Sequence, residues 1–145
     1  MTITKSGCED ADAKQNFVFH VVSTDLVNWQ HLPIALFPDS TGMIFSGSCV
    51  IDKYNTAGFG KDAMVAIYTA ASDKQSQAIA YSTDGGGSFT KYNAGLPVIT
   101  SDCPDFRDPK VFWYAPEKMW VMVLNERDGH SIYNSPNLKD WTFQS

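Results

Sequence analysis

The 145-residue chain contains 43% hydrophobic and 19% charged residues and carries a formal net charge of −5, a composition typical of a folded protein. This acidic balance argues against nucleic acid or an anionic membrane as a partner, and no apolar run approaches the roughly 18 residues of a membrane helix. Three cysteines, Cys8, Cys49 and Cys103, show neither a disulfide framework nor a zinc-ligand spacing. The sequence is compatible with one disulfide or with three free thiols. We expect no bound metal and no cofactor.

The N-terminal residues MTITKSGCEDADAKQ lack the apolar core of a secretory signal. Their sequence therefore leaves the location undetermined: either the chain stays in the cytoplasm or its leader has been removed. We divide the chain into an N-terminal segment, residues 1–16, and one β-rich domain, residues 17–145.

From residue 16 onward the apolar runs are short and rich in Val, Ile and aromatic residues. In chain order they are NFVFHVV, MVAIYTA, QAIAYS, WVMVLN and HSIYNS. Turn residues separate them, as in the Asp84–Gly87, Ala115–Lys118 and Arg127–Gly129 segments. Strand formers between tight turns predict an all-β fold.

Three of the predicted strand ends resemble one another: STDLVNWQ, STDGGGSFT and SPNLKDWTF. Each has a serine, then Asp or Asn two residues later, and then Trp or Phe. The serines, Ser23, Ser82 and Ser135, lie 59 and 53 residues apart. Short polar side chains that bond to nearby backbone are typical of hairpin turns.

The repeat extends to other strands, because FSGSCVID (Phe45–Asp52) aligns with FRDPKVFW (Phe106–Trp113) at an offset of 61 residues. Four short strands that repeat about every 50 residues indicate propeller blades. The chain then contains two full blades, preceded by the last two strands of another, so about two and a half blades. Because the terminal blades expose apolar faces and open edges, we expect self-association.

Two aspartates and an arginine crowd the start of one predicted strand, in Asp105–Pro109. The first strand of a propeller blade is the innermost, so the overlay directs Arg107 and Asp108 toward the same axial pocket as Phe45 and Ser46. The alternative is a surface turn with a local ion pair worth under ~1 kcal/mol. The repeat favours the pocket.

The segments FRDPKVFW, GMIFSGS, QSQAIAYSTDGG and SPNLKDWTF together resemble glycoside hydrolase family 32, the invertases, inulinases and levanases that cleave β-fructofuranosides. The resemblance covers about His20 to Ser145, with the motifs in the family's order and spacing, and residues 1–16 do not match. It departs from the family where Val18 and Phe19 replace a Trp-Gly pair. The resemblance implies a portion of a five-bladed β-propeller and a fructose-containing oligosaccharide or polysaccharide as partner.

The resemblance also implies roles for individual residues. Asp108 would hold fructose hydroxyls and stabilise the transition state, Arg107 would orient Asp108 and the sugar, and Phe45 and Ser46 would line the fructosyl subsite. Gln75 and Gln77 match a family Gln-x-Gln and would support substrate binding; the alternative is two polar residues at a strand entrance. His20 and Asp25 match family positions too, but we interpret both as turn and packing residues.

Two catalytic motifs of the family have no counterpart in the sequence. The nucleophile belongs to an Asn-Asp-Pro-Asn-Gly motif, which Asp10 and Asp12 do not match, and the acid/base belongs to a Glu-Cys motif, which Glu117 and Glu126 do not match. Two hypotheses follow. The chain is a truncated piece of a β-fructofuranosidase, inactive or nearly so in isolation, or it is a non-catalytic remnant that binds fructosides or has no function.

Overall fold

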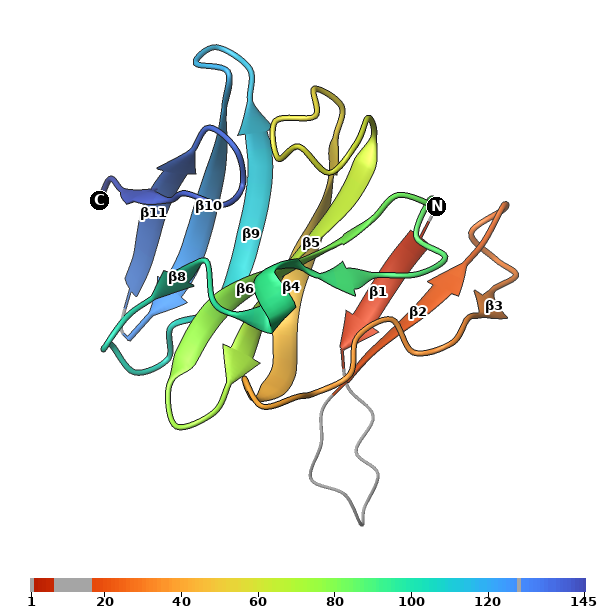
Figure 1. Cartoon of the computed structure of the whole chain (residues 1–145), viewed down its shortest axis with the longest axis horizontal. Coiled ribbons are helices and arrows are strands. Elements are labelled where there is room, and N and C mark those ends of the chain that lie inside the picture. The colour runs from red at the N-terminus through yellow and green to blue at the C-terminus, as the bar shows by residue number, and fades with distance from the viewer. Residues whose placement is uncertain (1, 7–16, 128) are drawn as a thin grey trace.

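A computed structural model describes residues 2–6, 17–127 and 129–145, and it confirms the predicted all-β fold. Three antiparallel sheets follow one another along the chain (Figure 1). The first contains β1 (Thr2–Ser6), β2 (Val18–Val22) and β3 (Gln30–His31). The second contains β4 (Met43–Asp52), β5 (Ala63–Ala71), β6 (Gln75–Ser82) and β7 (Thr90–Lys91), with β8 (Ile99–Thr100) on β6. The third contains β9 (Arg107–Tyr114), β10 (Met119–Glu126), β11 (Gly129–Ser135) and β12 (Thr142–Phe143).

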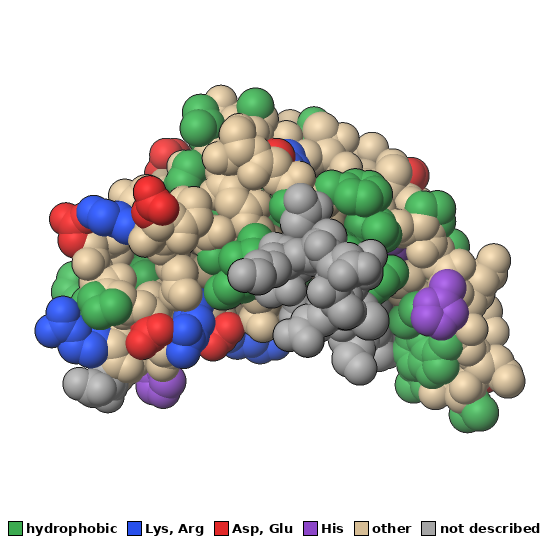
Figure 2. All heavy atoms as spheres, turned by 90° about the horizontal axis from the view of Figure 1, so that it is seen from below, with side chains coloured by type: hydrophobic (Ala, Val, Ile, Leu, Met, Phe, Trp, Pro, Cys, Tyr) green, Lys and Arg blue, Asp and Glu red, His purple; other side chains and the backbone are tan. Residues whose placement is uncertain are grey.

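The sheets fan out side by side, as successive propeller blades do, with the third sheet at the left of Figure 1 and the first at the right. From below, basic and acidic side chains lie next to each other on the side of the third sheet, and hydrophobic ones gather on the side of the first (Figure 2). Across the described part of the chain, no helix has the length and apolar character that crossing a membrane requires.

The core forms on both faces of the second sheet, because successive strand residues point to opposite faces. Val65 and Ile67 of β5 join a cluster with the third sheet, whereas Tyr68 and Ala70 join a cluster with the first. Residues 65–71 are consequently all buried. This double burial suits the central strand of a blade that has neighbours on both sides.

The three predicted turns connect the last two strands of each sheet. Ser23 Oγ accepts from the backbone N–H of Leu26 at 2.7 Å, Ser82 Oγ from that of Gly86 at 2.9 Å, and Ser135 Oγ from that of Asn137 at 3.2 Å. Each turn therefore satisfies its own backbone locally and returns the chain as a short outer strand.

Two details of the fold were not predicted. Thr2–Ser6, in the N-terminal segment, forms β1, which pairs with β2 from Thr2 opposite Val22 to Ser6 opposite Val18. In the second sheet the outer strand is split by a short 3-10 turn, η1 (Tyr92–Gly95), so that β7 and β8 pair with successive parts of β6.

The first strands of the second and third sheets, β4 and β9, each contain a one-residue bulge near their start. The first bulge lies between Ile44 and Gly47, and the second between Arg107 and Lys110. Aligning the sheets by these bulges gives an offset of 63 residues, not 61. The sequence overlay matched two phenylalanines with different environments, because Phe106 is fully buried and Phe45 is half-buried.

Candidate functional site

The backbone adopts a left-handed conformation at two positions of the Asp105–Pro109 segment. The φ angles of Asp105 and Asp108 are 62° and 59°. Aspartate tolerates this region better than most residues, but a residue before proline is normally extended. Asp108 therefore holds a strained backbone directly before Pro109, and such strain persists only where surrounding contacts impose it.

Arg107 joins the two aspartates. Its Nη1 lies 2.6 Å from Asp105 Oδ1 and its Nε lies 3.7 Å from Asp108 Oδ2. The Asp108 side chain is 53% exposed. The segment thus presents a carboxylate to solvent beside a guanidinium, while a second carboxylate holds that guanidinium in place.

A buried hydrogen-bond network from the second sheet holds this segment. The N–H of Asp108 donates to Thr69 Oγ1 at 3.2 Å, and Thr69 Oγ1 donates to Gln77 Oε1 at 3.1 Å. Gln77 Nε2 then donates to the carbonyl oxygen of Phe106 at 2.7 Å. Thr69 and Gln77 are fully buried. The structure therefore places Gln77 inside the scaffold, as a residue that positions the motif.

Sequence reasoning missed Thr69, which was treated only as part of an apolar strand. The available signal was a hydroxyl within the run MVAIYTA, because a buried polar group needs a partner.

Glu126 was likewise considered only as an unmatched carboxylate, yet it accepts from Ser101 Oγ at 3.0 Å and also from Ser131 Oγ. The bond from Ser131 is the main reason that the pKa of Glu126 lies below its usual value.

The end of β10 holds the loop that precedes Arg107, through Glu126 and through two further hydrogen bonds. Asn125 Nδ2 donates to the carbonyl oxygen of Asp105 at 3.3 Å, and the N–H of Arg127 donates to that of Pro104, also at 3.3 Å. The start of the Asp105–Pro109 segment is therefore attached to the end of β10, and the N–H of Asp108 attaches its later part to β5.

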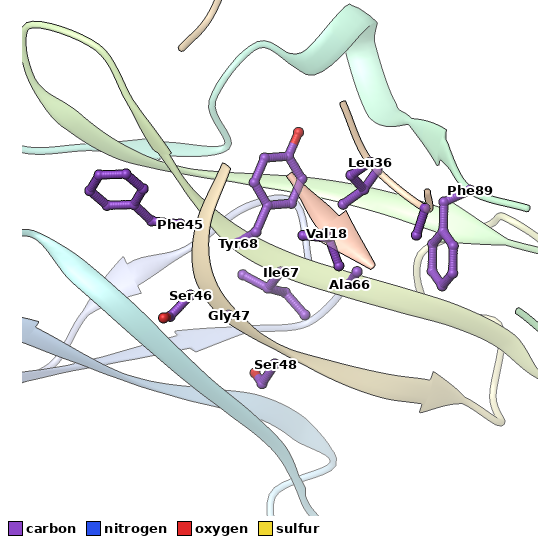
Figure 3. Close-up of a pocket in the computed structure, with 11 residues that line it drawn as sticks. Val18, Leu36, Phe45, Ser46, Gly47, Ser48, Ala66, Ile67, Tyr68 and Phe89 are labelled. Carbon is purple, nitrogen blue, oxygen red and sulfur yellow. The ribbon is translucent and has the colours of Figure 1, made fainter. Parts of the chain in front are cut away.

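Phe45 and Ser46 lie in the bulge near the start of β4, and Arg107 and Asp108 lie in the bulge near the start of β9, so both pairs are at the same end of two adjacent strands. One step further along, Ser48 Oγ accepts from the N–H of Val111 at 3.0 Å, which fixes β4 against β9. Phe45 and Ser46 line a mainly apolar cavity of about 160 Å³ between the first and second sheets, which includes Tyr68 (Figure 3). Phe45 also lines a cavity of about 420 Å³ together with Gln75 and Asp105.

Of the sequence-predicted site residues, Phe45 and Ser46 therefore share the smaller cavity, and Phe45 and Gln75 share the larger one. Arg107 and Asp108 line neither of these two cavities; they lie beside the larger one, attached to its wall through Asp105. Asp10 and Asp12, and the thiol of Cys8, lie outside the described residues, whereas Cys49 and Cys103 are free.

His20 and Asp25 have packing and turn roles. His20 is 1% exposed and lies edge-on to Phe89, and burial lowers its pKa below the ordinary value of 6.5. Within the described structure neither ring nitrogen of His20 has a hydrogen-bond partner. Asp25 accepts from the N–H groups of Val27 and Asn28, and the bonds to Asn28 and Val27 lower its pKa.

Comparisons of the sequence with a family model and with individual proteins identify the same family. The model for the glycosyl hydrolases family 32 N-terminal domain matches residues 9–145. A levanase of Bacillus subtilis (strain 168) is 59% identical over 131 residues, which cover 87% of this chain and 19% of the levanase. Invertase 2 of Saccharomyces cerevisiae is 41% identical over 136 residues, covering 87% of this chain and 25% of that enzyme.

Solved structures agree. A fructofuranosidase from Schwanniomyces occidentalis complexed with fructose superposes with a TM-score of 0.90 at 39% identity, covering 99% of this chain and 30% of that one. An exo-inulinase from Aspergillus awamori gives a TM-score of 0.84 at 36% identity and covers 99% and 34% of the two chains. The sequence thus spans between about a fifth and a third of the lengths of these relatives.

Proposed function

Because this chain belongs to glycosyl hydrolase family 32, we propose that its Arg107–Asp108 pair is the charge-stabilising part of a site that acts on β-fructofuranosyl linkages. The observation that carries the proposal is the backbone of Asp108. A left-handed residue ahead of a proline, held by Thr69 of another sheet and displaying a solvent-exposed carboxylate, is costly to maintain for structure alone.

The chemistry suits this arrangement. Cleavage of a fructoside builds positive charge on the anomeric carbon and the ring oxygen. A carboxylate that accepts hydrogen bonds from ring hydroxyls stabilises this charge more strongly as it develops. Asp108 is proposed for that role, and Arg107, fixed by Asp105, is proposed to orient Asp108 and the sugar.

Phe45, Ser46 and Gln75 are proposed as further contacts to the substrate. Phe45 offers an apolar ring that lines both cavities, Ser46 offers a polar group at the wall of the smaller one, and Gln75 offers one at the wall of the larger. Gln77 is proposed to act only through the backbone of Phe106, because its amide is buried and bonded there.

The substrate class is proposed to be fructose-containing oligosaccharides or polysaccharides, in view of the fructose and fructosylnystose complexes of the Schwanniomyces enzyme. The 145-residue sequence contains neither the Asn-Asp-Pro-Asn-Gly nor the Glu-Cys motif. We therefore propose that these residues alone bind fructosides without cleaving them, and that hydrolysis requires two further carboxylates about 5–5.5 Å apart.

Fructose binding by Asp108→Asn tests the proposal. Saturation-transfer NMR detects weak sugar binding directly, and the variant removes the charge while keeping the size of the side chain. We expect the fructose signal of this variant to fall severalfold. Asp62→Asn, at an exposed left-handed aspartate in the β4–β5 connection, is the matched control. Equal signals for both variants would exclude Asp108 as the sugar contact.

We also propose that the isolated chain self-associates through the outer face of the third sheet. Phe112 and Ile132 are exposed on this face, and both lie opposite valines of β10 in the strand register. The opposite face of the same sheet is covered by the second sheet. An equivalent packing between copies would remove the exposed apolar surface from water.

A further inference from the structure

Two aromatic side chains that reach solvent meet at the end of the sheets opposite to Asp108. Tyr54 belongs to the β4–β5 connection and Trp113 lies near the end of β9, and both segments are at the top of Figure 1. Their ring centroids are 5.2 Å apart, with an interplanar angle of 39°. Tyr54 is 68% exposed and Trp113 is half-buried. We name Tyr54 and Trp113 the aromatic platform.

The aromatic platform is separate from the candidate site. Asp108 is the second residue of β9 and Trp113 is the seventh, so at ~3.3 Å per residue the strand places them roughly 16 Å apart. Neither Tyr54 nor Trp113 lines either of the two cavities beside Phe45. A ligand on the platform therefore occupies a place of its own.

A buried network fixes the segment that carries Tyr54. The carboxylate of Asp52, which is fully buried, accepts from Thr56 Oγ1 at 3.1 Å and from the N–H of Ala57 at 2.8 Å. Thr56 Oγ1 in turn accepts from Nε1 of Trp120 at 2.8 Å. Because the chain is held on both sides of Tyr54, the position of its ring does not depend on a ligand.

Trp113 is held by the next strand of its own sheet. Its indole meets that of Trp120 in an edge-on arrangement, with ring centroids 5.1 Å apart and an interplanar angle of 67°. Trp120 is only 2% exposed, so Trp113 packs against a buried ring on one side and reaches solvent on the other. Two rings that are fixed before binding lose little conformational freedom when a ligand arrives.

The chemistry of the platform suits a neutral ligand that has both apolar and polar surface. Neither side chain carries a charge, and within the described residues neither the Tyr54 hydroxyl nor the Trp113 indole N–H is used in a hydrogen bond. Aromatic rings offer a large apolar face, and Tyr and Trp add a polar group at the edge. Sugar units combine C–H faces with hydroxyl groups, so they complement both parts of such a surface.

We propose that the aromatic platform binds an inner stretch of a fructan chain, away from the unit that reaches Asp108. This inference rests on the proposed substrate class of fructose-containing polysaccharides. A polymer presents many equivalent units, so one chain can contact the platform at one end of the sheets and the fructosyl site at the other. The first contact raises the effective concentration of the polymer at the second. The platform consequently favours long chains over short sugars.

Affinity electrophoresis in gels with and without levan tests the inference, because a bound polymer retards the protein. The variants are made in the Asp108→Asn chain, which lacks the proposed fructosyl contact. We expect Tyr54→Ala and Trp113→Leu to bind levan roughly two- to tenfold more weakly, the size of one lost ring contact. Tyr114→Ala is the matched control, since Tyr114 is 41% exposed and points to the opposite face of β9 from Trp113. Circular dichroism checks that each variant folds.

The outcomes separate this proposal from the function proposed for Asp108. If both platform variants bind levan as Tyr114→Ala does, the platform is not a sugar site, even where Asp108→Asn lowers the fructose signal in NMR. If the platform variants lose levan binding while Asp108→Asn keeps the fructose signal, the platform stands and the role of Asp108 is wrong.

Two further results would overturn the platform as a sugar site. The first is an Asp108→Asn chain that levan does not retard. The second is a shift of Tyr54→Ala and Trp113→Leu toward monomers in light scattering with levan binding unchanged, which would assign the two rings to a contact between copies of the chain.

Discussion

The backbone N–H of Asp108 donates a hydrogen bond to the hydroxyl of Thr69, 3.2 Å away in the preceding sheet. The same hydroxyl donates to Gln77, whose amide holds the carbonyl oxygen of Phe106. A single buried side chain thus connects the second sheet to the strained residue of the candidate site. The orientation of the Asp108 carboxylate consequently depends on how two sheets pack, and not only on its own loop.

Thr69→Val should expose this dependence. The substitution keeps the shape of the side chain but leaves the N–H of Asp108 and the buried oxygen of Gln77 without their partner. We expect a loss of about 1–3 kcal/mol in the free energy of unfolding, measured by urea denaturation. Thr142→Val, at an exposed position of β12, should change stability by less than ~0.5 kcal/mol. A Thr69→Val protein as stable as this control would contradict the role of the network.

Gly47→Ala should disturb the β4 bulge. An added Cβ would lie 2.1 Å from the carbonyl oxygen of Ile67 on the paired strand, a distance that backbone atoms must move to relieve. We expect a destabilisation of about 1–3 kcal/mol, as for overpacked positions, measured by thermal or urea unfolding. Gly129→Ala, where a Cβ meets nothing within 4 Å, is the matched control and should be nearly neutral.

Stability should fall as the pH falls below about 6.5, because of His20. Burial lowers the pKa of this histidine in the folded chain, although the charge of Asp84 partly opposes the shift. The unfolded chain therefore binds the proton first, so the contribution of neutral His20 is complete above pH 6.5 and is lost as the pH decreases toward the folded pKa.

Urea midpoints measured between pH 5 and pH 8 check this dependence. His20→Leu, which cannot be protonated, should show a flatter profile in this range than the unmodified chain. Two parallel profiles would mean that another group, and not His20, causes the decrease. Asp25 and Asp84, whose hydrogen bonds hold their pKa values far below this range, should not contribute there.

The sequence predicted the parts of the fold that depend on local chemistry. Short runs rich in Val, Ile and aromatic residues indicated the strands, and the serines at positions 23, 82 and 135 indicated the turns, since both patterns act over a few neighbouring residues. The charge cluster around Arg107 and Asp108 is also visible locally in the sequence, whereas its role stays a prediction. The two bulges were not predicted, because a change of register depends on the partner strand and leaves no mark on composition.

The inter-sheet network was also beyond sequence reasoning. Thr69 and Asp108 are separated by 39 residues, and nothing in either segment indicates the other. The pairing of Thr2–Ser6 with β2 was missed for a similar reason, because it depends on a partner strand that the segment itself does not indicate.

The exposed face of the third sheet should make the isolated chain associate. We expect light scattering at micromolar concentration to show species larger than one chain. Phe112→Glu should shift the distribution toward monomers, because it places a charge in the centre of the apolar face. Val27→Glu, at a residue that is 78% exposed in the β2–β3 turn, should have no such effect. A clean monomer of the unmodified chain would contradict the proposed interface.

The 145 residues alone should release no measurable fructose from sucrose, inulin or levan. General acid help alone accounts for typically ~10²–10⁴-fold of a rate, and the absence of the nucleophile motif removes the covalent route that divides one difficult step into two. Asp108 can stabilise a developing charge only when another group starts the reaction. Reducing-sugar assays of the purified chain measure this, with an intact levanase as the positive control.

Activity that survived repurification and disappeared in Asp108→Asn would overturn this expectation. It would mean that a carboxylate other than Asp108 supplies the nucleophile, with Asp10, Asp12 or a second copy of the chain as the sources to examine. Substituting Asp10 and Asp12 singly by Asn separates the first two. A second copy of the chain is tested by mixing Asp108→Asn with whichever of Asp10→Asn and Asp12→Asn is inactive. Restored activity in the mixture requires two copies that each contribute one carboxylate to a shared site.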